Sequence, residues 1–143
     1  MTITKKAEYA IWVLVELSGV PGEDYLSSAA VAARQGIPVN LIAQTVAVLR
    51  RAGWVRSQRG AAGGIRLEAD PAAISLRAVV EAVDGPLGIT RCLTGDAVCA
   101  NSGSCPLQGI WSEAQARMLD VLEGISIADL ARARKGVLVE RQP

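Results

Sequence analysis

Residues 25–67 carry the pattern that most restricts how this chain can fold. Ser27 or Ser28 can cap a short helix of Ala and Val residues, and Gly36 ends that helix. Pro38 then suits the first turn of a second helix, because proline fits the start of a helix and not its interior. Apolar side chains recur in this second helix at the spacing of one buried face, namely Ile42, Val46 and Leu49. The segment therefore predicts a helix-turn-helix.

A glycine-rich turn between two short strands follows the second helix. The sequence after Gly53 reads WVRSQ, then RGAAGG, then IRLE. A hairpin turn that needs positive φ explains the glycines. A phosphate-binding loop does not, because no Lys-Ser or Lys-Thr, no G-x-G-x-x-G and no helix start accompany them. We therefore expect a β-hairpin wing and no nucleotide substrate.

Arginines are concentrated in this part of the chain, although the net charge of the whole sequence is only +1. No Asp or Glu lies between Tyr25 and Leu67, and the acidic residues lie on either side. An ordinary solvated surface intersperses acids among bases, so a solvated basic face without a partner is the weaker interpretation. The charge suits phosphate groups, and double-stranded DNA is the partner we expect. The six arginines of this window are Arg34, Arg50, Arg51, Arg56, Arg59 and Arg66.

The predicted exposed face of the second helix is small and polar at its N-terminal end. It carries Asn40, Ala43, Gln44 and Ala47, which would let the backbone approach the floor of a major groove. Asn and Gln side chains can pair with base edges there, so Asn40 and Gln44 are the candidate base-reading residues. The wing arginines would lie beside a DNA backbone or a minor groove. The complete set of DNA-binding candidates is Asn40, Gln44, Arg50, Arg51, Arg56 and Arg59.

All three cysteines lie in one short stretch, RCLTGDAVCANSGSC, in a chain that contains no histidine. Cys92, Cys99 and Cys105 follow the spacing C-x6-C-x5-C, which differs from the C-x2-C pairs of zinc sites and of ferredoxin-type runs. Soft thiolates favour iron-sulfur clusters or zinc, and a carboxylate, an amide, solvent or a partner subunit could supply a fourth contact. Three incidental cysteines, or one disulfide with a free thiol, are the alternatives.

The composition favours a mainly helical fold. Half of the 143 residues are hydrophobic but aromatic residues are scarce, so Ala, Val, Leu and Ile must form the core. Helices are predicted at Thr4 to Ser18, from Ser75 to about Val83, and from Pro106 onwards, with Ser126 and Asp129 opening a last short helix. The long helix after Pro106 carries an apolar stripe that a second copy of the chain, or its own domain, would cover.

The predicted fold class is therefore mainly α with a small β-hairpin wing, plus a long C-terminal dimerisation helix. We expect three parts: a winged helix-turn-helix domain over 1–87, a cysteine-rich loop over 88–105, and the dimerisation helix with a C-terminal helix over 106–143. Glu8 and Glu16 interrupt the N-terminal apolar run, which argues against a signal peptide. No stretch reaches the roughly 18 apolar residues of a membrane span, so we expect a cytoplasmic protein. Without histidine or an activated nucleophile, we expect no enzyme.

Several segments carry a resemblance that covers nearly the whole chain. They are TKKAEYA, SSAAVAARQGIP, LRRAGWVRSQRGAAGG, ISLRAVVEAVDGPL and the cysteine loop, in this order. Together they resemble the winged-helix regulators typified by the iron-sulfur cluster regulator IscR and the nitric-oxide sensor NsrR. The resemblance implies a homodimer that binds pseudo-palindromic operator DNA. It also implies one iron-sulfur cluster per subunit, held by Cys92, Cys99 and Cys105, with a four-iron cluster preferred to a two-iron one.

Two departures from the family pattern concern the cluster. The first cysteine interval is one residue longer than usual, and Gln108 stands where the IscR-like branch has its histidine ligand. In the NsrR-like branch an acidic residue of the first helix reaches over from the partner subunit, and Glu8 occupies that place. The resemblance thus implies a repressor-type regulator controlled by a cluster that senses nitric oxide, oxygen or redox state, or iron. The alternative is a winged-helix regulator that senses through thiol oxidation or zinc.

Overall fold

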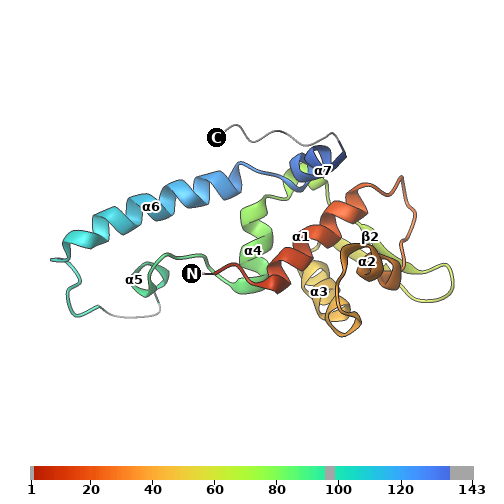
Figure 1. Cartoon of the computed structure of the whole chain (residues 1–143), viewed down its shortest axis with the longest axis horizontal. Helices are drawn as coiled ribbons and strands as arrows, with labels where there is room; N and C mark the ends of the chain where they lie inside the picture. The colour runs from red at the N-terminus through yellow and green to blue at the C-terminus, as the bar shows by residue number, and fades with distance from the viewer. Residues whose placement is uncertain (1, 96–98, 136–143) are drawn as a thin grey trace.

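The computed structural model describes residues 2–95 and 99–135. Parts of the predicted cysteine loop (96–98) and of the predicted C-terminal region (136–143) therefore lie outside the described residues. Helices and one two-stranded antiparallel sheet make up the fold (Figure 1). The elements are α1 (Lys5–Ser18), α2 (Ser28–Gln35), α3 (Val39–Arg51), β1 (Val55–Gln58), β2 (Gly64–Leu67), the 3₁₀ turn η1 (Pro71–Ala73), α4 (Leu76–Asp84), α5 (Arg91–Thr94), α6 (Pro106–Glu123) and α7 (Ile127–Lys135).

Local capping determines where three of the helices begin. Thr4, Ser27 and Ser75 each accept a hydrogen bond from the backbone amide three residues further on, at 3.3, 3.1 and 3.1 Å. These caps confirm the predicted starts of α1, α2 and α4. Pro38 is the N-cap residue of α3 rather than part of its first turn, and it makes no side-chain cap. The amides at the start of α3 are therefore left without a side-chain partner from the N-cap.

The main core lies between α1, α2, α3, α4 and the hairpin. The predicted stripe of α3 is buried, with Ile42, Val46 and Leu49 at 5, 8 and 0% exposure. Branched aliphatic side chains from the other elements pack against it, which confirms a core built without phenylalanine. The largest fully buried side chains are Leu14, Leu17, Leu49, Ile74, Ile127, Val13, Val31, Val79 and Val80.

The β-hairpin is fixed to the segment that precedes α2. Strands β1 and β2 pair antiparallel, with Val55 opposite Leu67 and Gln58 opposite Gly64. Leu26 and Ile65 exchange two backbone hydrogen bonds, of 2.9 and 2.8 Å, on the edge of β2 that faces away from β1. The wing is therefore held in a set position relative to the helix-turn-helix.

After the long helix α6, helix α7 packs back against α1 and the main core. Ile127 is fully buried in the main core, and backbone hydrogen bonds join Ile74 to Ile127 (2.9 Å) and Ile125 to Leu76 (2.7 Å). Ser126 and Asp129 form the predicted reciprocal cap at the start of α7. The last helix of the predicted C-terminal part thus packs on α1, away from the exposed end of α6 (Figure 1).

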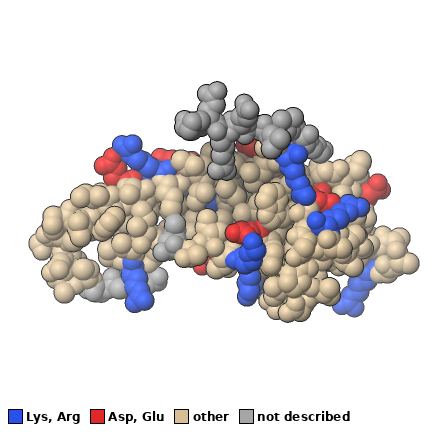
Figure 2. Space-filling model, in the orientation of Figure 1, with Lys and Arg blue, Asp and Glu red and all other residues tan. Residues whose placement is uncertain are grey.

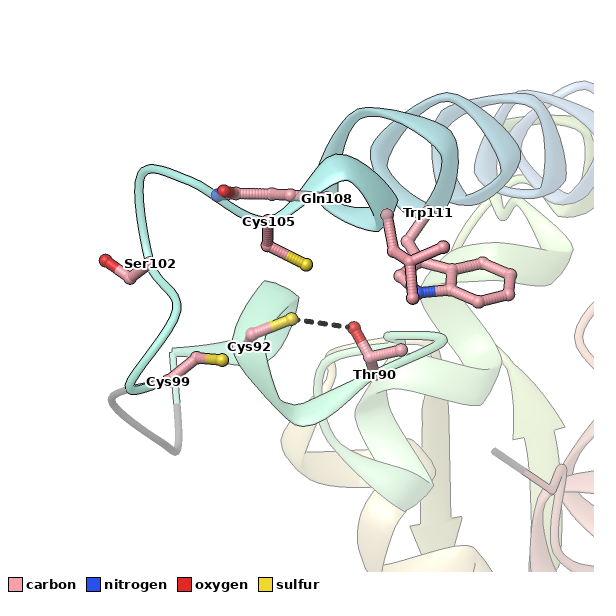
Figure 3. Close-up of a pocket in the computed structure, with 8 residues that line it drawn as sticks. Thr90, Cys92, Cys99, Ser102, Cys105, Gln108 and Trp111 are labelled. Carbon is pink, nitrogen blue, oxygen red and sulfur yellow. Dashed lines mark hydrogen bonds between the residues drawn. The ribbon is translucent and has the colours of Figure 1, made fainter.

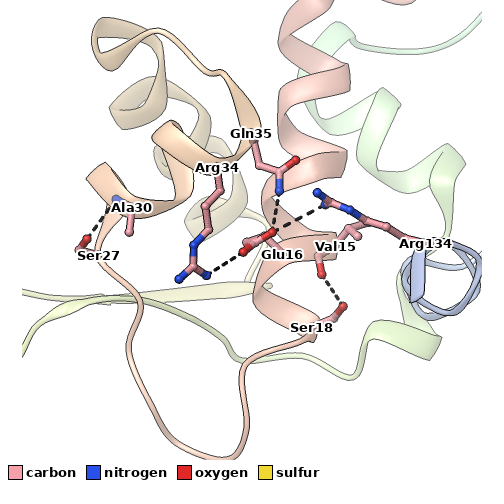
Figure 4. A network of polar contacts seen from close by, with 8 residues as sticks. All are labelled: Val15, Glu16, Ser18, Ser27, Ala30, Arg34, Gln35 and Arg134. Carbon is pink, nitrogen blue, oxygen red and sulfur yellow. Dashed lines mark hydrogen bonds and ion pairs between the residues drawn. The ribbon is translucent and has the colours of Figure 1, made fainter. Parts of the chain in front are cut away.

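One carboxylate joins three helices on this side of the molecule (Figure 4). Glu16 of α1 accepts hydrogen bonds from Arg34 (2.9 Å) and Gln35 (2.6 Å) of α2, and Arg134 of α7 lies 3.7 Å away. The Arg134 guanidinium also lies over the ring of Trp12, 5.6 Å from its centre. Only 16% of the Glu16 side chain is exposed, so solvent screens these contacts weakly. Glu16 therefore links α7 directly to the first helix of the helix-turn-helix.

Helix α6 extends away from the compact body (Figure 1), and its C-terminal half packs against that body. Met118, Leu119 and Leu122 pack against a small cluster that includes Val80 of α4 and Leu87. The predicted apolar stripe is thus partly covered by its own chain. Three of its other large side chains stay exposed, namely Leu107, Ile110 and Val121 at 49, 59 and 66%.

Candidate nucleic-acid interface and cysteine site

The outward face of α3 is open, as the sequence predicts. Asn40, Ala43, Gln44 and Ala47 are all exposed, and none of these side chains is large enough to hold a DNA groove away from the helix backbone. Ala47 lies at the centre of this face, because three surface cavities around α3 all include it in their lining. The structure thus brings the two base-reading candidates onto one accessible surface.

Unpaired arginines surround this face. Arg50, Arg51 and Arg59 are exposed and form no ion pair with any described residue. Arg56 of β1 lies 3.3 Å from Glu68, an exposed pair that a phosphate could replace at little cost. In the face that Figure 2 shows, Lys and Arg side chains project from the lower edge of the molecule, both toward the end that carries the wing in Figure 1 and at the opposite end, below α5. The cavities around Ala47 are lined by Gln44, Arg50, Arg51 and Arg56, which therefore share one side of the fold.

Two other arginines of residues 25–67 form ion pairs within the protein instead. Arg34 binds Glu16, and Arg66 lies 3.8 Å from Glu23 and 3.7 Å from Glu68. The Arg66 guanidinium also stacks on Tyr25, 5.2 Å from the ring centre. The glutamates that pair with them lie outside residues 25–67 in the sequence, but the fold brings them next to these two arginines. The surface around α3 therefore carries fewer unpaired arginines than the sequence of residues 25–67 suggests.

The three cysteines line one cavity of about 300 Å³ at the start of α6 (Figure 3). Cys92 lies on α5, Cys99 in the following loop, and Cys105 is the N-cap residue of α6. Cys99 and Cys105 are partly buried, whereas Cys92 is exposed, and all three are free thiols. The remaining lining residues are Thr90, Ser102, Leu107, Gln108 and Trp111.

Backbone and side-chain hydrogen bonds hold this loop against α6. The Ile89 amide donates to the Gln115 side chain of α6 (3.1 Å), and the Ser102 amide donates to the Cys99 carbonyl (3.0 Å). The Thr90 hydroxyl and the Cys92 sulfur lie 3.0 Å apart, within hydrogen-bonding distance. The N-terminus of the 18-residue helix α6 adds a positive electrostatic end beside Cys105. The cavity wall therefore suits a group that carries negative charge.

The donor set of this cavity is soft and suits an iron-sulfur cluster. Three soft sulfurs face one cavity, which is the ligand chemistry that such clusters use. Among residues 2–95 and 99–135, however, no three His, Cys, Asp or Glu side chains converge closely enough to hold one ion. A cluster of several irons places its ligands further apart than a single ion does. The three thiols of this cavity wall are thus the residues that would hold such a group.

Glu8 lies on α1 and does not line the cysteine cavity. Its carboxylate pairs with Lys5, and this hydrogen bond and charge raise the pKa of Lys5. The Glu8 side chain is 45% exposed and the pair is solvated, so another partner could replace Lys5 at little cost. Among the described residues of one chain, the oxygen-bearing side chains that line the cavity are Thr90, Ser102 and Gln108.

A winged helix-turn-helix with unpaired arginines around an open reading helix defines a DNA-binding transcription regulator. A model of the Rrf2 family, described as an iron-dependent transcriptional regulator, matches residues 3–133, and this chain belongs to that family. No helix among the described residues is long and apolar enough to cross a membrane.

Known relatives agree with this assignment. The chain is 32% identical to the HTH-type transcriptional regulator IscR of Vibrio cholerae over 130 residues, covering 91% of this chain and 75% of that protein. Among solved structures, CymR (YrzC), the global cysteine regulator of B. subtilis, has a TM-score of 0.77 at 27% identity, covering 92% of this chain and 96% of that one. IscR of T. potens has a TM-score of 0.71 at 26% identity, covering 96% and 93%. The resemblance to IscR-type regulators is confirmed, and the chain is a regulator rather than an enzyme.

Proposed function

We propose that this protein is a homodimeric regulator whose binding to operator DNA is controlled by an iron-sulfur cluster, one per subunit. Cys92, Cys99 and Cys105 would hold the cluster, with Glu8 of the partner subunit as the fourth ligand and four irons preferred to two. The observation that carries this proposal is three free thiols lining one cavity in a chain without histidine. Because it acts on operator DNA, the protein would work in the cytoplasm.

The chain's own residues provide a physical connection from the cysteines to the DNA-reading unit. Cys105 is the N-cap of α6, so a ligand held there fixes the start of that helix. The far end of α6 leads into α7, which is packed in the core and bound to Glu16. Glu16 in turn holds α2, the first helix of the helix-turn-helix. Ordering of the loop would therefore bias the arrangement of the two reading helices in a dimer.

A carboxylate ligand would determine the chemistry of sensing. When bound, the cluster supplies an iron whose oxygen ligand is harder and more readily displaced than a thiolate, and so is open to nitric oxide, oxygen or iron loss. In the free chain Glu8 is paired with Lys5, so its release from a cluster would not leave an unpartnered carboxylate.

The exposed apolar residues Leu107, Ile110 and Val121 of α6 support a second subunit on that face.

The test is anaerobic purification followed by an absorption spectrum with iron and sulfide counts. We expect a coloured wild-type protein, and no stable cluster in Cys99→Ala. Glu8→Ala should retain a cluster with an altered spectrum or faster loss, and Glu8→Asp, which keeps a carboxylate, should lie closer to wild type. Glu113→Ala is the matched control, because Glu113 is an exposed carboxylate paired with Arg117 on α6 and does not line the cavity. A spectrum unchanged by Glu8→Ala would refute the ligand assignment.

The second candidate is a regulator that senses through thiol oxidation or zinc without a cluster. The fold similarity to CymR, a cysteine regulator, and the free thiols around one cavity favour it as the alternative. It predicts a colourless anaerobic protein that contains stoichiometric zinc or forms a reversible disulfide. Failure of iron and sulfide to reconstitute any colour would select it over the cluster.

A further inference from the structure

Lys6 is an exposed cation on α1, outside the arginine-rich window, and its side chain pairs with none of the described acids. Among the described residues it forms neither an ion pair nor a side-chain hydrogen bond, whereas its neighbour Lys5 binds Glu8 and lies 6.0 Å from the centre of the Tyr9 ring. Nearby Asp84 is already engaged, because both of its oxygens accept hydrogen bonds from Thr4. Two adjacent lysines on one helix thus have different surroundings.

The Lys6 side chain lines a surface cavity of about 370 Å³ beside the reading helix. The same cavity is lined by Gln44 and Arg51 of α3, and Arg51 is the second unpaired cation there. Val83 of α4 forms part of the wall. The cavity therefore lies on the α1 and α4 side of α3, and it adjoins the predicted base-reading residue Gln44.

Two further cavities that include Ala47 lie on the wing side. One is lined by Arg50, Ser57 and Gln58, and the other by Arg50, Arg51 and Arg56. Cations therefore flank the exposed face of α3 on both sides. A helix that enters a major groove is bordered by the two phosphate backbones of that groove, so it needs cations on both sides.

We propose that Lys6, together with Arg51, binds a phosphate of the DNA backbone on the side of α3 that faces away from the wing. The hydrogen bonds between Thr4 and Asp84 fix the start of α1 against the end of α4 and so position Lys6 at the cavity. This inference rests on DNA binding through α3, but it does not depend on the iron-sulfur cluster.

Salt dependence separates a phosphate contact from a solvated lysine. Each neutralised phosphate contributes about 0.9 to the slope of log Kobs against log salt, and loss of a cation that shares one phosphate lowers the slope by up to that amount. Between about 50 and about 200 mM salt, the wild-type protein should therefore lose more affinity than Lys6→Ala, by up to roughly three- to fourfold for each subunit bound. A solvated lysine gives no such difference.

The experiment measures binding to a mixed-sequence DNA duplex by fluorescence anisotropy over that salt range, because a backbone contact does not require the operator sequence. Lys5→Ala is the matched control, since it removes one positive charge at the adjacent position. Lys6→Arg should keep the wild-type slope. The double variant of Lys6→Ala with Arg51→Ala should lose less than the sum of the two single losses, because both cations bind one phosphate.

The possible results are distinguishable. A reduced slope for Lys6→Ala, with Lys5→Ala close to wild type, supports the inference. An unchanged slope for Lys6→Ala, or an equal reduction for both variants, overturns it while leaving the regulator itself intact. Wild-type protein that binds no duplex overturns both the inference and the proposed function. Thermal unfolding of each variant by circular dichroism shows whether the fold is retained.

Discussion

The attachment of the wing predicts a large cost for one glycine substitution. Gly64 has a φ of +147°, and a Cβ added there would lie 2.4 Å from the Leu26 carbonyl oxygen, which is backbone and cannot swing aside. Relieving this clash would separate Leu26 from Ile65 and break their two hydrogen bonds, each worth about 1 kcal/mol. Positive φ adds about 1–2 kcal/mol for alanine. Alanine also lowers the conformational entropy of the unfolded chain, which offsets about 0.4–1 kcal/mol of this cost. Gly64→Ala should therefore destabilise the protein by about 3 kcal/mol.

Gly60→Ala supplies the comparison, because it isolates the backbone strain from the clash. Gly60 also has positive φ (+105°), but nothing lies within 4 Å of an added Cβ, so its cost should be only about 1 kcal/mol. Urea unfolding monitored by circular dichroism gives both free energies. DNA affinity should also fall further for Gly64→Ala, since the wing would move relative to α3. A Gly64→Ala variant that loses no more stability than Gly60→Ala would show that the Leu26 to Ile65 contact does not fix the wing.

Three further predictions concern DNA reading, the core and pH. Gln44→Ala should lose about 1–3 kcal/mol of DNA-binding free energy at its cognate base pair, whereas Arg59→Ala should weaken binding evenly across sequences. Equal losses on operator and random DNA for Gln44→Ala would contradict its base-reading role. Ile127→Ala should cost about 2–5 kcal/mol in urea unfolding, because this side chain is fully buried between α7 and the core; a loss below about 1 kcal/mol would mean that α7 is not held there. Hydrogen bonds from the amide and hydroxyl of Ser126 hold the pKa of Asp129 below its ordinary value of 3.8, so this carboxylate stabilises the fold above pH 3.8 and the contribution is lost as the pH falls further. In acid unfolding, Asp129→Asn should lack this pH-dependent contribution, which the wild-type protein has. Identical acid-unfolding profiles of the two proteins would show that Asp129 does not contribute to stability.

Features that depend on neighbouring residues could be predicted from the sequence. The caps at Thr4, Ser27 and Ser75 are local, because each side chain bonds an amide only three residues away. The buried stripe of α3 follows from helical spacing, and the wing follows from its glycine-rich turn. For the same reason, the exposed positions of Asn40 and Gln44 were predictable from the period of the helix.

Features that depend on contacts between distant segments could not be predicted. Arg34 looks like a free cation in the sequence, yet Glu16, 18 positions earlier, neutralises it. The sequence places the C-terminal helix outside the winged helix-turn-helix domain, but the full burial of Ile127 places the start of this helix in the main core. Lys6 lies outside the arginine-rich window and reaches the surface of α3 only through the packing of α1. The cysteine spacing indicates a common centre, whereas the cavity and its wall residue Trp111 require the fold.

The anchoring of only one end of α6 has a mechanical consequence. The backbone bonds that pair Ile74 with Ile127, and Leu76 with Ile125, hold the C-terminal end of this helix on the body of the protein. Its other end begins at Cys105, 18 residues away, or about 27 Å along the axis. A tilt of about 10° at the anchored end therefore displaces the free tip by about 5 Å. Under the proposed function, a displacement of atomic size at the thiols would therefore require only a small change in the angle of α6 beside the DNA-reading helices.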